Sequence, residues 1–253
     1  MSTTVIEGQS GGLTIERRPV AWASLLAVGF LAVSTLGTTA LNAAVPSLDG
    51  KNRDLVVELL LAAFVLAIVA VLRWRHDVGI NGLSEWRHLS LLILPLIVVF
   101  VPFAGGFKST DTTTLAVLLV GYAANSIAED GMFRGIIPRV LRSRGLVWVV
   151  VLSSLLFGLV HFGNILSRPE QSVAITAAQA VGALTQGIGL IAVRLATRTV
   201  LPVLVIHFLS DLFLQLGGFP SIPANVIESV VMLAFGIWIL RKYRRELAES
   251  GWV

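Results

Sequence analysis

Residues 55–72 read LVVELLLAAFVLAIVAVL, an apolar run that carries a single charged side chain, Glu58. A transmembrane helix needs about 20 mainly apolar residues, so this run is typical of a membrane span. The whole chain of 253 residues is 55% hydrophobic and only 13% charged, whereas a soluble domain has about 25% charged residues. This composition excludes a disordered chain, a coiled coil and an ordinary cytosolic enzyme.

Seven further runs have the same apolar character. The eight candidate spans are residues 20–43, 55–72, 88–104, 115–137, 146–164, 172–193, 199–216 and 224–240. Pro95 and Pro102 lie in the third span and predict that it is kinked or partly re-entrant. The sequence thus predicts an all-α protein, a polytopic membrane helical bundle with about eight transmembrane helices.

The Lys and Arg residues divide unevenly between the two sets of loops. If the N-terminus is cytoplasmic, the cytoplasmic segments carry 14 of the 19, the outside loops carry 4 and one lies within a span. Positive residues concentrate on the cytoplasmic side, so we expect an integral multi-pass protein of the cell membrane with cytoplasmic N- and C-termini. The basic residues form short clusters between apolar runs and no stripe, which predicts membrane lipid and not nucleic acid as a partner.

Ionisable side chains inside a bilayer are costly and therefore mark functional sites. Away from span ends they are Glu129, Asp130 and Arg134 in 115–137, His161 in 146–164, and His207 and Asp211 in 199–216. Residues four apart lie on one face of a helix. This spacing pairs Asp130 with Arg134 and leaves Glu129 for chemistry, while Tyr122 and Asn125 extend the polar stripe of the same span.

These residues resemble three motifs of one family. Residues 129–134, Glu-Asp-Gly-Met-Phe-Arg, are similar to the Glu-Glu-x-x-x-Arg motif of the CAAX-protease and bacteriocin-processing (CPBP, or Abi) family. Phe157 and His161 match its Phe-x-x-x-His motif, and His207 and Asp211 match its His-x-x-x-Asn/Asp motif. The three occur in the family's order within residues 112–216. Asp130 stands where the family has a second glutamate.

The resemblance implies an intramembrane endopeptidase of the CAAX-protease type. Such an enzyme would hydrolyse a peptide bond of a membrane-associated peptide or protein with a glutamate-activated water, and whether its substrate is prenylated stays open. Carried over by position, Glu129 would be the general base and His161 would hold the water with it. His207 and Asp211 would stabilise the oxyanion, and Asp130 and Arg134 would be supporting residues.

A metal ion is the alternative to this glutamate mechanism. Two histidines and a carboxylate could bind Zn²⁺, and Glu129, His161 and His207 would be the ligands. The sequence has no His-Glu-x-x-His, and each histidine lies in a different span, so the metal-free mechanism is favoured. The chain has no cysteine, which excludes thiolate ligands and a cysteine nucleophile.

The depth of the site residues predicts the side of access. Counted from the cytoplasmic ends of their spans, Glu129 and His207 each lie about 8 residues in, or about 12 Å. His161 lies about 15 residues from Leu146, or about 22 Å, so the three meet only if its span begins deep or is tilted. We expect access from the cytoplasmic side.

Two functions of other classes stay open. The chain could be a catalytically silent membrane immunity or scaffold protein on the same fold, acting by binding. It could also be a proton-coupled transporter, although the sequence shows little of the internal repetition that transporters have.

The domain organisation follows from these assignments. Residues 1–19 are a flexible cytoplasmic tail, and 20–111 are the N-terminal transmembrane helices. Residues 112–216 are the CPBP-like catalytic core, and 217–253 hold the last transmembrane helix and a basic cytoplasmic tail.

Overall fold

The structure is a computed structural model that describes residues 15, 17–167, 171–247 and 249. The expected tail 1–19 therefore lies mostly outside the described residues, and so does Arg168 of the predicted outside loops. Within the described residues the chain is helical, and its one β feature is an isolated antiparallel bridge between Phe107 and Gly217. The prediction of an all-α membrane bundle is confirmed.

Seven long helices make up most of the bundle. They are α2 (Pro19–Ala44), α3 (Gly50–Val71), α5 (Thr112–Asp130), α7 (Leu146–Val160), α9 (Val173–Thr197), α10 (Leu201–Leu216) and α11 (Ser221–Lys242). The short helices are α4 (Ile93–Val98), α6 (Ile137–Leu141), α8 (Asn164–Ser167) and α12 (Arg244–Leu247). Each of the eight predicted spans falls on helical structure. The closest packing joins α9 with α11, α3 with α5 and α7 with α9.

Not every predicted span is a long apolar helix. Among the described residues, five helices are long and apolar enough to cross a membrane: α2, α3, Leu146–Leu166, α9 and α11. Leu89–Gly105 and α10 are shorter apolar segments. The first of these is broken into 3₁₀, α and 3₁₀ pieces, as its two prolines predict, because proline cannot donate a helical hydrogen bond.

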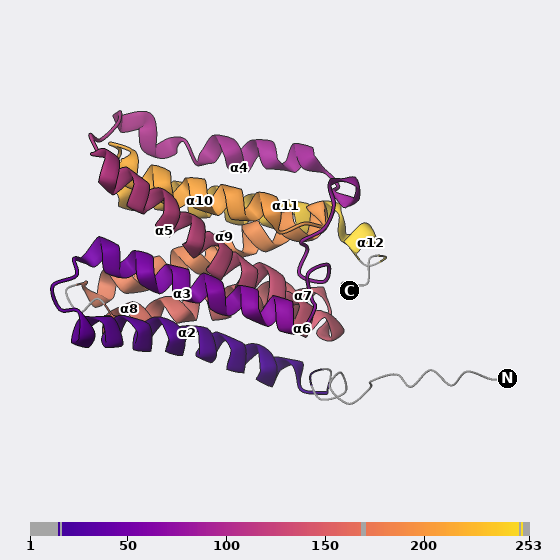
Figure 1. The fold of residues 1–253 in the computed structure, drawn as a ribbon. Coiled ribbons are helices and arrows are strands. Elements are labelled where there is room, and N and C mark those ends of the chain that lie inside the picture. Colours follow the sequence, from indigo (N-terminus) through magenta and orange to yellow (C-terminus); the bar gives the residue numbers. More distant parts are fainter. Residues whose placement is uncertain (1–14, 16, 168–170, 248, 250–253) are drawn as a thin grey trace.

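The chain passes back and forth, so its turns collect at two opposite ends of the bundle (Figure 1). One end, here the terminal end, holds residues 72–88, 142–145 and 198–200 together with the start of α2 and helix α12. The other, here the far end, holds residues 45–49, 106–111 and 217–220.

Helices α3 and α5, which start at the far end, have side-chain caps. Asp49 accepts hydrogen bonds from the backbone N–H groups of Lys51 and Asn52 at the start of α3. Asp111 accepts one from Thr114 N at 2.9 Å at the start of α5. These N–H groups lack partners within their own helix, so a capping carboxylate fixes where each helix begins. The same hydrogen bonds hold the pKa of Asp111 below its ordinary value.

Two helices extend beyond their predicted boundaries. Helix α5 continues through a π-helical turn, η4 (Gly131–Ile136), into α6, so the helical path runs to Leu141. Helix α9 continues to Thr197 and buries Arg194, whose Nη2 donates to Asp77 O at 3.1 Å. Arg194 was counted among the basic residues of a cytoplasmic segment, and it is part of the protein interior instead.

Candidate functional site

Asp130 and Arg134 form a buried ion pair at the end of α5. Arg134 Nη1 lies 3.1 Å from Asp130 Oδ1, and both side chains are almost completely buried. This is the pairing that the four-residue spacing predicts. Asp130 is the last residue of α5 and Arg134 lies in the π-helical turn that follows it, a type of irregularity that is frequent at functional sites.

Asp130 has a second partner, because its other carboxylate oxygen binds a histidine from α10. His207 Nδ1 lies 2.9 Å from Asp130 Oδ2. An ionised carboxylate only accepts hydrogen bonds, so the Nδ1–H of His207 donates. Asp130 therefore links Arg134 to His207 and fixes the orientation of the imidazole ring. Asp130, which stands where the family motif has a second glutamate, makes both contacts.

The other nitrogen of His207 faces two carboxylates. Nε2 lies 3.6 Å from Glu129 Oε2 and 3.5 Å from Asp211 Oδ2. Asn125, one turn before Glu129 on α5, donates from Nδ2 to Asp211 Oδ2 at 3.0 Å. The polar stripe of α5 thus positions both Glu129 and Asp211 beside one histidine nitrogen.

Helix α7 supplies the aromatic floor of the site. The Arg134 guanidinium carbon lies 3.9 Å from the centroid of the Phe157 ring, a cation–π contact. The same ring meets His161 edge-on at a centroid distance of 4.9 Å. His161 follows one turn later and its Nδ1–H donates to the carbonyl oxygen of Phe157 at 2.9 Å. Because the two residues are four apart, Phe157 contacts Arg134 while His161 lines the cavity.

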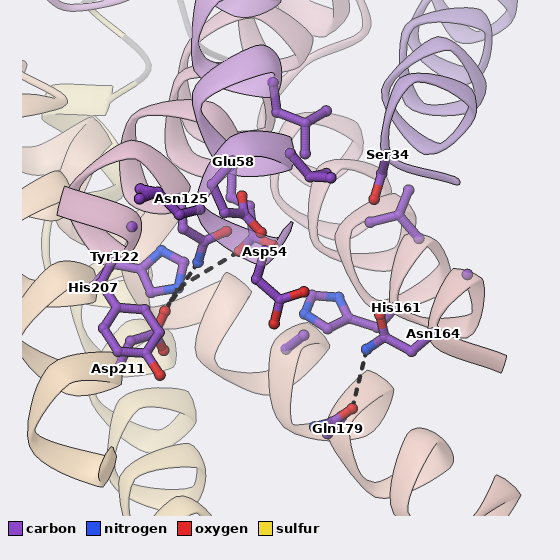
Figure 2. Close-up of a pocket in the computed structure, with 18 of the residues that line it drawn as sticks. Ser34, Asp54, Glu58, Tyr122, Asn125, His161, Asn164, Gln179, His207 and Asp211 are labelled. Carbon is purple, nitrogen blue, oxygen red and sulfur yellow. Dashed lines mark hydrogen bonds and ion pairs between the residues drawn. The ribbon is translucent and has the colours of Figure 1, made fainter. Parts of the chain in front are cut away.

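A cavity of about 550 Å³ joins these groups, and Glu129, His161, His207 and Asp211 all line it. Figure 2 shows His161, Asn164 and Gln179 on one side of this cavity and His207, Asp211, Asn125 and Tyr122 on the other. The structure therefore brings together the four residues predicted as catalytic. Asp130 and Arg134 are absent from the lining and lie behind it, as supporting residues would.

The difference in depth between Glu129 and His161 that the sequence predicts is much reduced in the structure. The helical path that holds Glu129 continues past the predicted boundary at 137 to Leu141, so Glu129 lies about 18 Å from the end of that path. His161 lies about 22 Å from Leu146 by the same measure. His207 lies about 9 Å from Leu201 at the start of α10 by the same measure, and its contacts with Glu129 and Asp130 bring it to the site.

Three acidic residues near the site were missed by the sequence analysis. Asp54 and Glu58 line the cavity from α3, and Glu228 is buried on α11, where its Oε2 accepts a hydrogen bond from Ser210 at 2.6 Å. Glu58 and Glu228 are each charged residues within an apolar run, the same signal that identified Glu129. Their positions near span ends made that signal easy to discount.

The side chains do not form a ready metal site. Among the described residues, no three His, Asp or Glu side chains are grouped so that they could hold a metal ion. Zinc needs three or four converging ligands, and Glu129, His161 and His207 are not grouped in that way as their side chains lie. The Nδ1–H of His207 donates to Asp130, which leaves Nε2 as the nitrogen that could bind an ion.

Comparisons with known proteins agree with the three motifs. Residues 111–213 match a family model described as Rce1-like, type II CAAX prenyl endopeptidase. The match covers all three motifs and confirms the resemblance to the CAAX-protease family. A search of curated proteins found no match to the chain. The apolar helices indicate an integral membrane protein, and residues 111–213 of it are similar to the CAAX-protease family.

Proposed function

Given that residues 111–213 are those of an Rce1-like endopeptidase segment, we propose that the chain hydrolyses a peptide bond of a membrane-associated substrate with a water activated by Glu129. The observation that carries this proposal is the convergence of Glu129, His161, His207 and Asp211 on one cavity. A general base must lie within reach of the proton that it removes, and the cavity gives a water molecule access to the Glu129 carboxylate.

The reaction can be written with these residues alone. Glu129 takes a proton from the water, and the water oxygen attacks the carbonyl carbon of the scissile peptide bond. His207 Nε2, protonated and flanked by Glu129 and Asp211, donates to the oxyanion that forms. The C–N bond then breaks, and the proton held by Glu129 passes to the leaving amine.

Two groups position the reactants. His161 faces the cavity and holds the attacking water together with Glu129. Asp130 and Arg134 act through His207. The Asp130 carboxylate lies between Arg134 and His207 and accepts the Nδ1–H of the imidazole, which turns Nε2 toward the cavity. They are positioning residues and touch no reacting atom. This mechanism needs no metal ion.

The substrate and location follow from the same arrangement. A site within a helical bundle in the bilayer is reached by peptides that are tethered to or inserted in the membrane. Basic residues at the terminal end, including Arg73, Arg75, Arg142 and Arg144, support a cell-membrane orientation with both termini in the cytoplasm. Whether the substrate is prenylated is tested by offering the protein both prenylated and unmodified peptides.

A comparison of protein termini in membranes tests the proposal. Cells would express the native chain, the Glu129→Gln variant or the Glu85→Gln variant at equal level. Glu85→Gln is the matched control because it makes the same change to an exposed carboxylate that does not line the cavity. We expect new termini with the native chain and with Glu85→Gln, and none with Glu129→Gln.

The silent immunity or scaffold function predicts the opposite result. Termini would then be identical in all three strains, and the cellular phenotype would persist with Glu129→Gln. Cleavage that stops when a chelator is added and returns with zinc would contradict the metal-free mechanism while leaving the peptidase activity in place.

A further inference from the structure

The cavity reaches only one end of the bundle. Its lining includes Lys51 in the first turn of α3, Gln215 near the end of α10 and Ser221 at the start of α11, and all three are exposed. These residues lie at the far end, beside residues 45–49 and 217–220. A continuous hollow thus leads from Glu129 to the surface at the far end.

Toward the terminal end the same bundle is filled. Directly after Asp130, Met132 and Phe133 are fully buried, and so are Ile136, Ile137 and Leu141. The Phe133 ring packs between Phe30 of α2 and Phe157 of α7, at centroid distances of 5.3 and 5.2 Å. Close-packed side chains of this kind leave no space for a peptide.

The two ends also differ in charge. Basic residues gather at the terminal end, which the positive-inside rule places in the cytoplasm. The far end, with Lys51 and Asp54 at the mouth of the cavity, then faces away from the cytoplasm. The depth of Glu129 and His207 suggested cytoplasmic access, but depth along a helix does not show which side of the residue is hollow.

We propose that the substrate is a peptide segment presented at the non-cytoplasmic surface of the membrane, and that it enters at the far end past Lys51 and Ser221. This inference rests on the proposed function, since it names the side from which the peptidase site is reached. The plug formed by Phe30, Phe133 and Phe157 separates the reacting groups from the cytoplasm.

Because the native chain has no cysteine, single introduced thiols report the accessibility of each end directly. Ser221→Cys places a thiol at the mouth of the cavity, and Ser34→Cys places one on its wall. Ser143→Cys is the matched control, because Ser143 is an exposed serine at the terminal end. Intact cells would be treated with a membrane-impermeant maleimide, and a second sample would be permeabilised first.

We expect Ser221→Cys and Ser34→Cys to be labelled in intact cells, and Ser143→Cys only after permeabilisation. The reverse pattern would overturn the proposal. If Ser34→Cys does not fold, Asn164→Cys on the same cavity wall replaces it. Labelling needs no catalysis, so this result stands apart from the Glu129→Gln test: an inactive protein could show the expected labelling, and an active one could show the reverse.

Discussion

The helical path from Thr112 to Leu141 crosses two regions that differ in almost every respect. Before Asp130, α5 presents Gly121, Tyr122 and Asn125 to a polar cavity. After Asp130, the π-helical turn and α6 present side chains that are fully buried among their neighbours. One element thus forms the wall of a hollow half and the centre of a filled half, and the reacting groups lie at the boundary.

This difference shows how support and space are divided within the bundle. The filled half supports His207 through the buried pair Asp130 and Arg134. The hollow half contains the cavity and its polar lining, where the proposed mechanism places water and substrate. Changes in the filled half should therefore alter stability, whereas changes in the hollow half should alter activity.

The largest effect is expected from Arg134→Ala in the filled half. Removal of one partner of a buried ion pair costs about 3–5 kcal/mol when the remaining charge is uncompensated, and the contact of Asp130 with His207 places the expected cost toward the lower end of that range. Lys51→Ala, a matched loss of a cation at the exposed mouth of the hollow half, should change stability by less than about 0.5 kcal/mol. Thermal unfolding in detergent compares the two variants, and equal shifts in Tm would contradict the division into halves.

Glycine substitutions along the helix sharpen the same comparison. A Cβ atom at Gly131 would lie 2.7 Å from Val65 Cγ1, whereas one at Gly121 would lie 3.9 Å from Leu55 Cδ1. Overpacking costs about 1–3 kcal/mol, so Gly131→Ala should lower the Tm and Gly121→Ala should not. Val65→Ala combined with Gly131→Ala should recover part of the loss, and the absence of any recovery would show that the close contact is not the cause.

In the hollow half, Asn125→Ala should affect activity more than stability. It removes the amide that donates to Asp211 at 3.0 Å, and such a hydrogen bond contributes about 1 kcal/mol to folding. Misplacement of a reacting group can lower the rate by about a hundredfold. The rate of product formation and the Tm would be measured together, and a full rate with a large loss of Tm would contradict this assignment.

The smallest effect is expected at the cap of α5. The pKa of Asp111 is lowered by the hydrogen bond from Thr114 N, so its ionised form favours the folded state. This contribution is complete above the ordinary value of 3.8 and is lost as the pH falls through the lowered folded pKa. Asp111→Ala should therefore lower the Tm slightly at neutral pH and not at all at strongly acid pH. If the difference in Tm between the native chain and Asp111→Ala persists at acid pH, the ionised Asp111 carboxylate is not its source.

The sequence predicted the features that depend on spacing within one helix. The helical class, the pairing of Asp130 with Arg134, and the shared face of Phe157 and His161 follow from the helical repeat. The contact between Asp130 and His207 could not be predicted, because it joins helices 77 residues apart in the chain. The π-helical turn was not predicted either; within it Gly131 packs close to Val65 of α3 and Gly135 close to Val78, contacts between segments far apart in the chain.

The direction of the cavity could not be predicted either. Hydropathy shows that Glu129 lies within a span, but not whether space lies above or below it. That depends on Phe133, an ordinary apolar residue in sequence, which packs between Phe30 and Phe157 only in the assembled bundle.

The most direct test of the central claim uses purified protein in detergent. Native chain and the Glu129→Gln variant would each be incubated, in water labelled with heavy oxygen, with a peptide mixture that includes prenylated and unmodified members. Mass spectrometry would then identify any new C-terminal carboxyl groups. If Glu129 activates the attacking water, the native chain should give products that carry one heavy oxygen atom, and the variant should give no such products. Equal amounts of labelled product from both proteins would contradict the assignment of Glu129 as the base that activates water.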